Sequence, residues 1–143
     1  MAQSPFAFYR GTAAVMAHDL ASDPVTGLDV VACGDAHVAN FGLYATPERT
    51  LTFDLNDFDE ASDAPWEWDV KRLATSALIG ALDTGLRSDQ AQDIARACVT
   101  AYRQTLAEMM RLSAIERYYY NGETSWMQTT LDSETQKLVR RTA

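Results

Sequence analysis

The feature that most constrains this chain is an acidic stretch near its middle. Residues 54–69 contain no Lys or Arg and seven acidic residues: Asp54, Asp57, Asp59, Glu60, Asp63, Glu67 and Asp69. Because the net charge of the 143-residue chain is −8, nearly all of its excess negative charge falls in this stretch. Leu55, Phe58, Trp66 and Trp68 are interspersed among the acids, so some of these carboxylates must lie against an apolar core.

A partly buried acidic cluster needs something to offset its charge. Two carboxylates about 4 Å apart repel each other by roughly 4 kcal/mol at an effective dielectric constant near 20. The cluster therefore requires a cation or carboxyl groups with raised pKa values. A hard divalent cation bound through oxygen atoms would meet that requirement. The alternative is a solvated acidic loop without a ligand. The acidity of the chain also argues against a nucleic-acid partner.

Composition indicates one folded, soluble domain over residues 1–143. The hydrophobic fraction is 47% and the charged fraction is 22%, which are ordinary values for a globular protein. The sequence contains no run of about 18 apolar residues, so we expect no membrane span. We see no secretory signal, and Cys33 and Cys98 do not form a disulfide framework. A reduced, cytoplasmic setting is therefore expected.

Hydrophobic periodicity predicts several helices. Ser4-Pro5 is typical of a helix start, and apolar residues recur at helical spacing as far as Leu20. A second helix is expected to open at Asp63-Ala64-Pro65 and to end at Gly85. Ser88 is expected to cap a third helix that stops near Asn121-Gly122, and residues 125–143 predict a weaker fourth helix.

Short strands are expected between the first two helices. Residues 28–33 form a Val-rich apolar run, and residues 41–45 and 51–55 are predicted to pair as a hairpin. The fold class is therefore α+β, with short strands and a hairpin that carry the acidic loops and pack on several helices.

Two polar segments flank the predicted hairpin and hold the candidate functional residues. The first, residues 33–40, contains Asp35, His37 and Asn40; the second, residues 53–59, contains Asp54 and Asp57. Because a hairpin brings its two ends together, both segments should converge. A carboxylate at Asp35 could accept a proton from a substrate hydroxyl, and the Asn40 amide oxygen could share a metal with a second carboxylate. The alternative is a turn that holds a hydrogen-bonded histidine.

These segments resemble those of a known enzyme group. Gly-Asp-x-His-x-x-Asn at 34–40 is similar to the catalytic loop of aminoglycoside phosphotransferases and choline kinases, a branch of the protein-kinase-like folds. Asp57-Phe58-Asp59 is similar to the metal-binding Asp-Phe-Glu segment of that branch. Asp69, twelve residues after Asp57, resembles the structural Asp that opens the following helix. The resemblance implies a fold like the C-terminal lobe of these kinases.

The sequence also resembles domain-of-unknown-function family 2252, a group of uncharacterised bacterial proteins. The likeness extends over essentially all 143 residues and is sharpest between Ser-Pro-Phe-Ala-Phe-Tyr-Arg-Gly at 4–11 and Trp-Glu-Trp-Asp-Val-Lys-Arg-Leu at 66–73. Proteins of that family are considerably longer, so the resemblance implies that this chain is a fragment of a longer kinase-like protein. The missing remainder of the polypeptide would then be one of its partners.

The resemblance implies a role for each candidate residue. Asp35 would be the catalytic base, Asn40 and Asp57 would be ligands of Mg²⁺, and Asp69 would be a buried anchor. Asp54 is a second candidate for the metal-ligand position of Asp57, because it directly follows the strand. The remaining candidates, His37 and Arg10, are expected to be structural residues near the site. Arg10 would act as a counter-ion to the acidic loop. Cys33 departs from the pattern, since the phosphotransferases usually have His at that position.

Two functions remain open at this point. In the first, the intact polypeptide transfers phosphate from ATP, with Mg²⁺, to a hydroxyl acceptor on an unknown small molecule or protein. In the second, the chain is a truncated metal-binding or interaction module without catalysis. The seven glycines are too scattered to form a phosphate-binding loop, so no ATP-binding residue can be assigned. A metallophosphoesterase would need further histidines, and only His18 remains.

Overall fold

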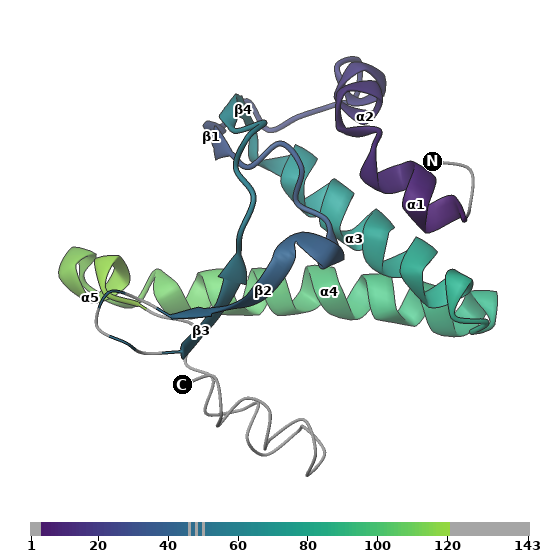
Figure 1. Cartoon of the computed structure of the whole chain (residues 1–143). Helices are drawn as coiled ribbons and strands as arrows, with labels where there is room; N and C mark the ends of the chain where they lie inside the picture. Colours follow the sequence, from purple (N-terminus) through teal and green to yellow (C-terminus); the bar gives the residue numbers. More distant parts are fainter. Residues whose placement is uncertain (1–3, 46, 48, 50, 121–143) are drawn as a thin grey trace, which may run out of the picture. The chain divides into compact units, whose positions relative to one another are not determined.

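In the computed structural model, residues 4–45, 47, 49 and 51–120 are described, and they form five α-helices and two two-stranded sheets (Figure 1). The α+β class is therefore confirmed. The chain divides into two compact units, one made of residues 1–40 and 57–111 and the other of residues 41–56 and 112–143. The candidate polar loop and the start of the long central helix both belong to the first unit.

The N-terminal segment forms two helices where the sequence predicts one. Helix α1 (Pro5–Arg10) begins at the predicted cap, where Ser4 Oγ accepts a hydrogen bond from the Ala7 N–H at 3.1 Å. Helix α2 (Ala13–Leu20) follows after a break at Gly11 and Thr12. The Thr12 hydroxyl donates to the Tyr9 carbonyl at 2.8 Å, which competes with the helical pattern and explains the break.

The first unit contains a sheet that the sequence did not predict. Strand β1 (Asp29–Ala32) lies within the predicted strand and pairs antiparallel with β4 (Ser62–Pro65). The sequence pattern assigned residues 63–65 to a helix start, but these residues are extended, and Pro65 is the N-cap of the next helix. The pairing brings residues 33–40 and 57–61, which both belong to the first unit, to the same end of one sheet.

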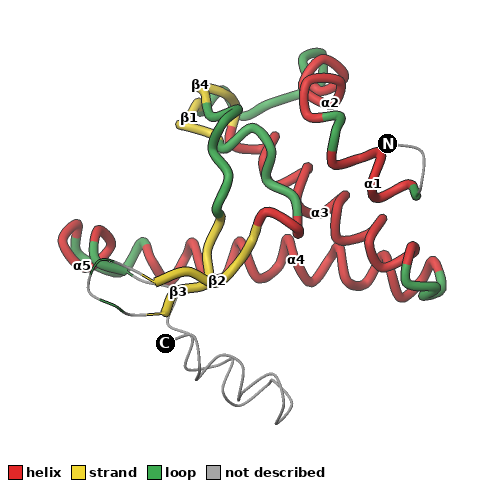
Figure 2. Tube along the Cα trace, in the orientation of Figure 1, coloured by secondary structure: helices red, strands yellow, loops and turns green. Residues whose placement is uncertain are grey.

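The second unit contains the predicted hairpin, with the expected bounds. Strand β2 (Phe41–Ala45) pairs antiparallel with β3 (Leu51–Leu55) (Figure 2). In this pairing Phe41 lies opposite Leu55. The rings of Phe41 and Phe53 stack with centroids 6.1 Å apart. The chain therefore leaves for the hairpin directly after Asn40 and returns two residues before Asp57.

Two long helices follow the strands and lie side by side (Figure 1). Helix α3 (Trp66–Asp83) ends before Gly85, which has a φ of 86° as expected for a left-handed helix end. Helix α4 (Ser88–Met109) begins at Ser88 itself, with Arg87 rather than Ser88 at the N-cap. The Gln90 side chain accepts the Arg87 N–H at 3.1 Å, which moves the cap back by one residue.

The predicted extension of the third helix to about residue 121 is wrong. Helix α4 stops at Met109, and a separate short helix α5 (Ala114–Tyr118) belongs to the second unit. A capping box separates the two helices: Ser113 Oγ accepts the Glu116 N–H, and the Glu116 carboxylate accepts the Ser113 N–H. The predicted helix over 125–143 lies outside the described residues.

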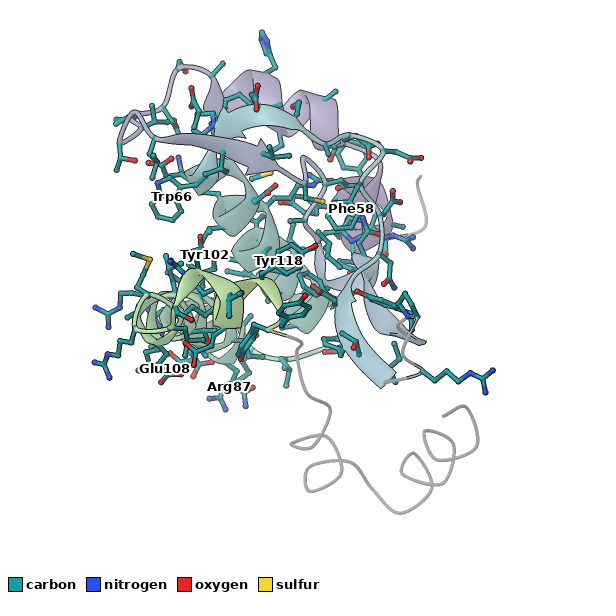
Figure 3. All side chains as sticks on the ribbon, turned by 90° about the vertical axis from the view of Figure 1, so that its left-hand side faces the viewer. Phe58, Trp66, Arg87, Tyr102, Glu108 and Tyr118 are labelled. Carbon is teal, nitrogen blue, oxygen red and sulfur yellow. The ribbon has the colours of Figure 1, made fainter. Side chains whose placement is uncertain are left out.

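The core of the first unit contains small apolar residues and an unusual number of polar ones. Its buried apolar residues are Ala32, Cys33, Ala36, Ala64, Ala81 and Ala91. Its buried polar residues are Asp35, His37, Arg72 and Ser76. The larger Trp66 ring instead stacks on Tyr102 of α4 at 5.9 Å (Figure 3). Because the buried residues are small or polar, hydrogen bonds and ion pairs are the main contacts that hold the polar loop in place.

No helix within the described ranges is long and apolar enough to cross a membrane.

Candidate functional site

A glycine opens the polar loop immediately after β1. Gly34 has a φ of 82°, a backbone conformation that residues with a side chain rarely adopt. A Cβ atom at this position would also collide with the carbonyl oxygen of Glu60. Both facts require glycine, and the second shows that the loop packs directly against the backbone of residues 57–61.

The loop is fastened to α3 by a single carboxylate. Asp69, in the first turn of that helix, accepts the backbone N–H of Cys33 at 2.7 Å and that of Gly34 at 3.0 Å. Each carboxylate oxygen takes one donor, so two otherwise unpaired amides are satisfied by one side chain. Asp69 thus joins the first turn of α3 to the start of the polar loop.

Cys33 joins the loop to the second polar segment. Its thiol donates to the backbone carbonyl of Asp57, with 3.2 Å between Sγ and O. Burial is the main cause that raises the pKa of the Cys33 thiol, which keeps it protonated and able to donate. Asp35, Asp57 and Asp69 also raise that pKa through their negative charges, so all three acids lie near this cysteine.

The candidate base Asp35 is buried in an ion pair with Arg72. Arg72 Nε and Nη2 both lie 2.5 Å from Asp35 Oδ1. Only 8% of Asp35 and 2% of Arg72 are exposed. The second carboxylate oxygen of Asp35 faces His37 Nε2 at 3.6 Å, which is beyond hydrogen-bonding distance. One oxygen of Asp35 is therefore held by the guanidinium, and the other has no closer partner among the described residues.

Arg72 is the functional-site residue that sequence reasoning missed. Its Nη2 donates to the Tyr9 carbonyl at 3.1 Å, its guanidinium lies 4.6 Å from the Tyr9 ring centre, and the Tyr9 hydroxyl donates back to the Arg72 carbonyl. Helix α1 is thereby joined to the Asp35 loop through one side chain. A signal existed, because Arg72 follows Asp69 by three residues and so shares its helix face.

The other polar residues of the loop hold its shape. Asn40 Nδ2 donates to the Asp35 carbonyl at 3.0 Å, which leaves the Asn40 amide oxygen as the free end of that side chain. Ser76 Oγ accepts the Val38 N–H at 3.0 Å. His37 is 2% exposed, and its Nδ1 has no hydrogen-bond partner in the part of the chain that is described. Burial is the main cause that lowers the pKa of His37.

The remaining predicted residues are placed less centrally. Arg10 reaches this network through its backbone, since its carbonyl accepts from Arg72 Nη2 at 3.5 Å. Asp57 is exposed, and its Oδ1 accepts the Asp59 N–H at 3.3 Å. Asp54 lies on β3 in the second unit, where its Oδ1 accepts the N–H of Leu55. Among described residues, no three His, Cys, Asp or Glu side chains cluster closely enough to hold a metal by themselves.

A pocket of about 280 Å³ adjoins the loop within the first unit. Its apolar wall comes mainly from α2, β1 and β4 and includes Ala17, Ala32 and Ala64. Its polar lining includes Asp69 and Arg72, the residues that fasten the loop and its carboxylate. The side chains of Asp69 and Arg72 therefore border this pocket.

Comparison with known proteins gives a family and no characterised relative. No curated protein and no solved structure matches the sequence. Residues 1–143 match a family described as "Uncharacterized protein conserved in bacteria (DUF2252)". Because the match extends over the whole sequence, the chain belongs to this family of uncharacterised bacterial proteins.

Proposed function

We propose that this chain carries the catalytic-loop part of a Mg²⁺- and ATP-dependent phosphotransferase that acts on a hydroxyl acceptor. The observation that carries the proposal is the pair of hydrogen bonds that the Asp69 carboxylate accepts from the backbone N–H groups of Cys33 and Gly34. These hydrogen bonds attach the loop that contains Asp35 and Asn40 to helix α3. The order of the motifs along this chain resembles that of kinase-like phosphotransferases. In phosphoryl transfer the protein contributes mainly by holding the reacting groups in position and by stabilising their charge, and a rigidly attached loop serves the first of these.

Asp35 has the geometry to receive a proton at one atom. Arg72 holds Oδ1, so the carboxylate has a fixed orientation and a neutralised environment. Among the residues that the structure describes, Oδ2 has no donor closer than His37 Nε2 at 3.6 Å, and it is the oxygen that we assign to the acceptor hydroxyl. Arg72 is thus a positioning residue in this proposal, and Asp35 is the base.

The oxygen atoms near the loop suit a magnesium ion. The amide oxygen of Asn40 is the free end of its side chain. The Asp57 carboxylate is exposed, and its Oδ1 accepts one long hydrogen bond, from the Asp59 N–H at 3.3 Å. Magnesium is commonly bound through one or two protein oxygens, with water and substrate phosphates completing its shell. Bound Mg²⁺ would neutralise phosphate charge, and Asn40 and Asp57, both in the first unit, would hold it.

A metal titration tests this proposal. Mn²⁺ binding, measured by electron paramagnetic resonance with and without ATP, should be saturable in wild type and at least tenfold weaker in Asp57→Asn. Asp35→Asn should retain metal binding, and Asp63→Asn, a neighbouring exposed acid on β4, serves as the matched control. Folded wild-type protein that binds no Mn²⁺ with or without ATP would refute the proposal.

One observation favours the second candidate, a metal-binding module without catalysis. Asp35 is buried and paired with Arg72, which is the usual state of a structural carboxylate. In that case Asp57 would still bind Mn²⁺, but ATP would not strengthen the binding. Transfer of phosphate from labelled ATP to water or to a panel of alcohols would be absent in wild type and would not change in Asp35→Asn.

A further inference from the structure

We infer that the Cys33 thiol is a positioning residue for Asp57, and that its hydrogen bond to the Asp57 carbonyl sets where the Asp57 carboxylate lies. The inference rests on the proposed metal site and names a second residue on which that site depends. Neither the motif nor the family description assigns Cys33 a role. At this position the resembling phosphotransferases usually have His, and the role inferred for Cys33 comes from the contacts of the cysteine itself.

The cysteine is held rigidly on its own side. Its backbone N–H donates to Asp69 at 2.7 Å, and Asp69 stands in the first turn of α3. Only 6% of the residue is exposed, so the thiol has little freedom to choose another partner. With the backbone tied to a helix and the side chain buried, Sγ presents a fixed donor at 3.2 Å from the Asp57 carbonyl oxygen.

The partner segment has few other restraints. Residues 57–61 are all exposed, and their own hydrogen bonds are local, from Asp59 N–H to Asp57 and from Ala61 N–H to Phe58. Among the described residues, the Cys33 thiol makes the only hydrogen bond between this segment and the polar loop. The second contact between them is the close packing of Gly34 on the Glu60 carbonyl, which involves no side-chain donor.

Position along the chain makes this link specific for Asp57. The hydrogen bond ends on the carbonyl of the same residue whose carboxylate is the candidate ligand. Without it, the next residue along the chain that pairs with another strand is Ser62, which lies opposite Ala32 in the sheet. Four exposed residues, 58–61, would then separate Asp57 from the sheet, and the carboxylate would sample many positions.

The test compares two cysteine variants with a matched control. Cys33→Ala removes the donor, Cys33→Ser restores a hydroxyl donor, and Cys98→Ala removes the half-buried cysteine of α4, far from the loop in sequence. Two quantities are measured on the full chain after circular dichroism has established folding. They are the Mn²⁺ dissociation constant and the hydrogen-exchange rates of the amides of residues 57–61 without metal.

The inference predicts a specific pattern. In Cys33→Ala the Mn²⁺ dissociation constant should rise about tenfold, as for other residues that orient a metal ligand. The amides of Asp59 and Ala61 should exchange at least tenfold faster. Cys33→Ser should recover most of both effects, and Cys98→Ala should show neither. Unchanged exchange in Cys33→Ala, or a serine variant no better than alanine, would overturn the inference.

The exchange measurement also separates this inference from the proposed function. If wild-type protein binds no Mn²⁺ while Cys33→Ala still loosens residues 57–61, the proposed metal site fails and the link between Cys33 and Asp57 stands. If metal binds and Asp57→Asn abolishes it while Cys33→Ala changes nothing, the proposed site stands and the role of Cys33 is refuted.

Discussion

Replacing Arg72 with methionine removes the cation that faces a buried carboxylate. Asp35 would lose its cationic partner in the core, and the Tyr9 carbonyl would lose its donor at 3.1 Å. Breaking a buried ion pair from one side costs about 3–5 kcal/mol. Because both residues are more than nine-tenths buried, solvent cannot replace the lost charge, and we expect the free energy of unfolding to fall by that amount.

Urea denaturation followed by tryptophan fluorescence measures this loss. A Trp126→Phe background confines the signal to Trp66 and Trp68 of α3. The matched control is Lys71→Met, which removes the neighbouring cation on the same helix. Its Nζ pairs with Asp23 at 2.7 Å, but both side chains are over a third exposed, so the cost should stay below about 1 kcal/mol.

A double-mutant cycle sharpens the test. If the cost comes from the pair, Arg72→Met combined with Asp35→Asn should lose at least about 1.5 kcal/mol less than the sum of the two single changes. Arg72→Lys keeps the charge but loses the forked donor geometry, so it should fall between wild type and methionine. A loss below about 1 kcal/mol in Arg72→Met, or strict additivity in the cycle, would refute the reasoning.

Three further outcomes follow from the same loop. Gly34→Ala should lower the free energy of unfolding by about 2–4 kcal/mol, because it adds a clash with Glu60 to an unfavourable φ. Gly27 also has a positive φ but lies in open space, so Gly27→Ala should cost about 1 kcal/mol, and thermal unfolding distinguishes the two variants. Burial lowers the pKa of His37, so as the pH falls the unfolded chain binds a proton at this residue before the folded chain does. The contribution of His37 to the free energy of unfolding should be fully present above about pH 6.5 and should decrease as the pH drops below it. In urea titrations at several pH values, His37→Gln should remove that part of the pH dependence. Asp69→Asn replaces a carboxylate oxygen by an NH₂ group facing an N–H, and should cost about 1–3 kcal/mol in urea titrations and weaken Mn²⁺ binding; unchanged binding would contradict an anchoring role.

Local sequence signals predicted the elements that are specified locally. The hairpin at 41–55, the cap at Ser4 and the left-handed Gly85 each depend on residues close in sequence, and the structure confirms all three. Strand β4 escaped prediction because its pairing with β1 spans some thirty residues, and Ser-Asp-Ala-Pro has little strand character of its own. The break at Gly11 and Thr12 depends on one side-chain hydrogen bond.

The same distinction applies to the candidate site. Asp35, Asn40, Asp57 and Asp69 stand out by motif and spacing, and their roles remain predictions. Arg72 did not stand out, because an arginine on a helix is usually exposed, and only the fold reveals that this one is buried against Asp35. Its spacing from Asp69 places it on the same helix face, but only the fold shows which residues it contacts.

The placement of the hairpin has a consequence for how sequences of this type can vary. The chain enters the hairpin after Asn40 and leaves it just before Asp57, and the opposed pair Phe41 and Leu55 closes its base. Residues added or removed in matched pairs beyond that base would preserve the alternation of the two strands. A single-residue insertion within β3 would instead reverse the faces of that strand and disturb the return of the chain to Asp57.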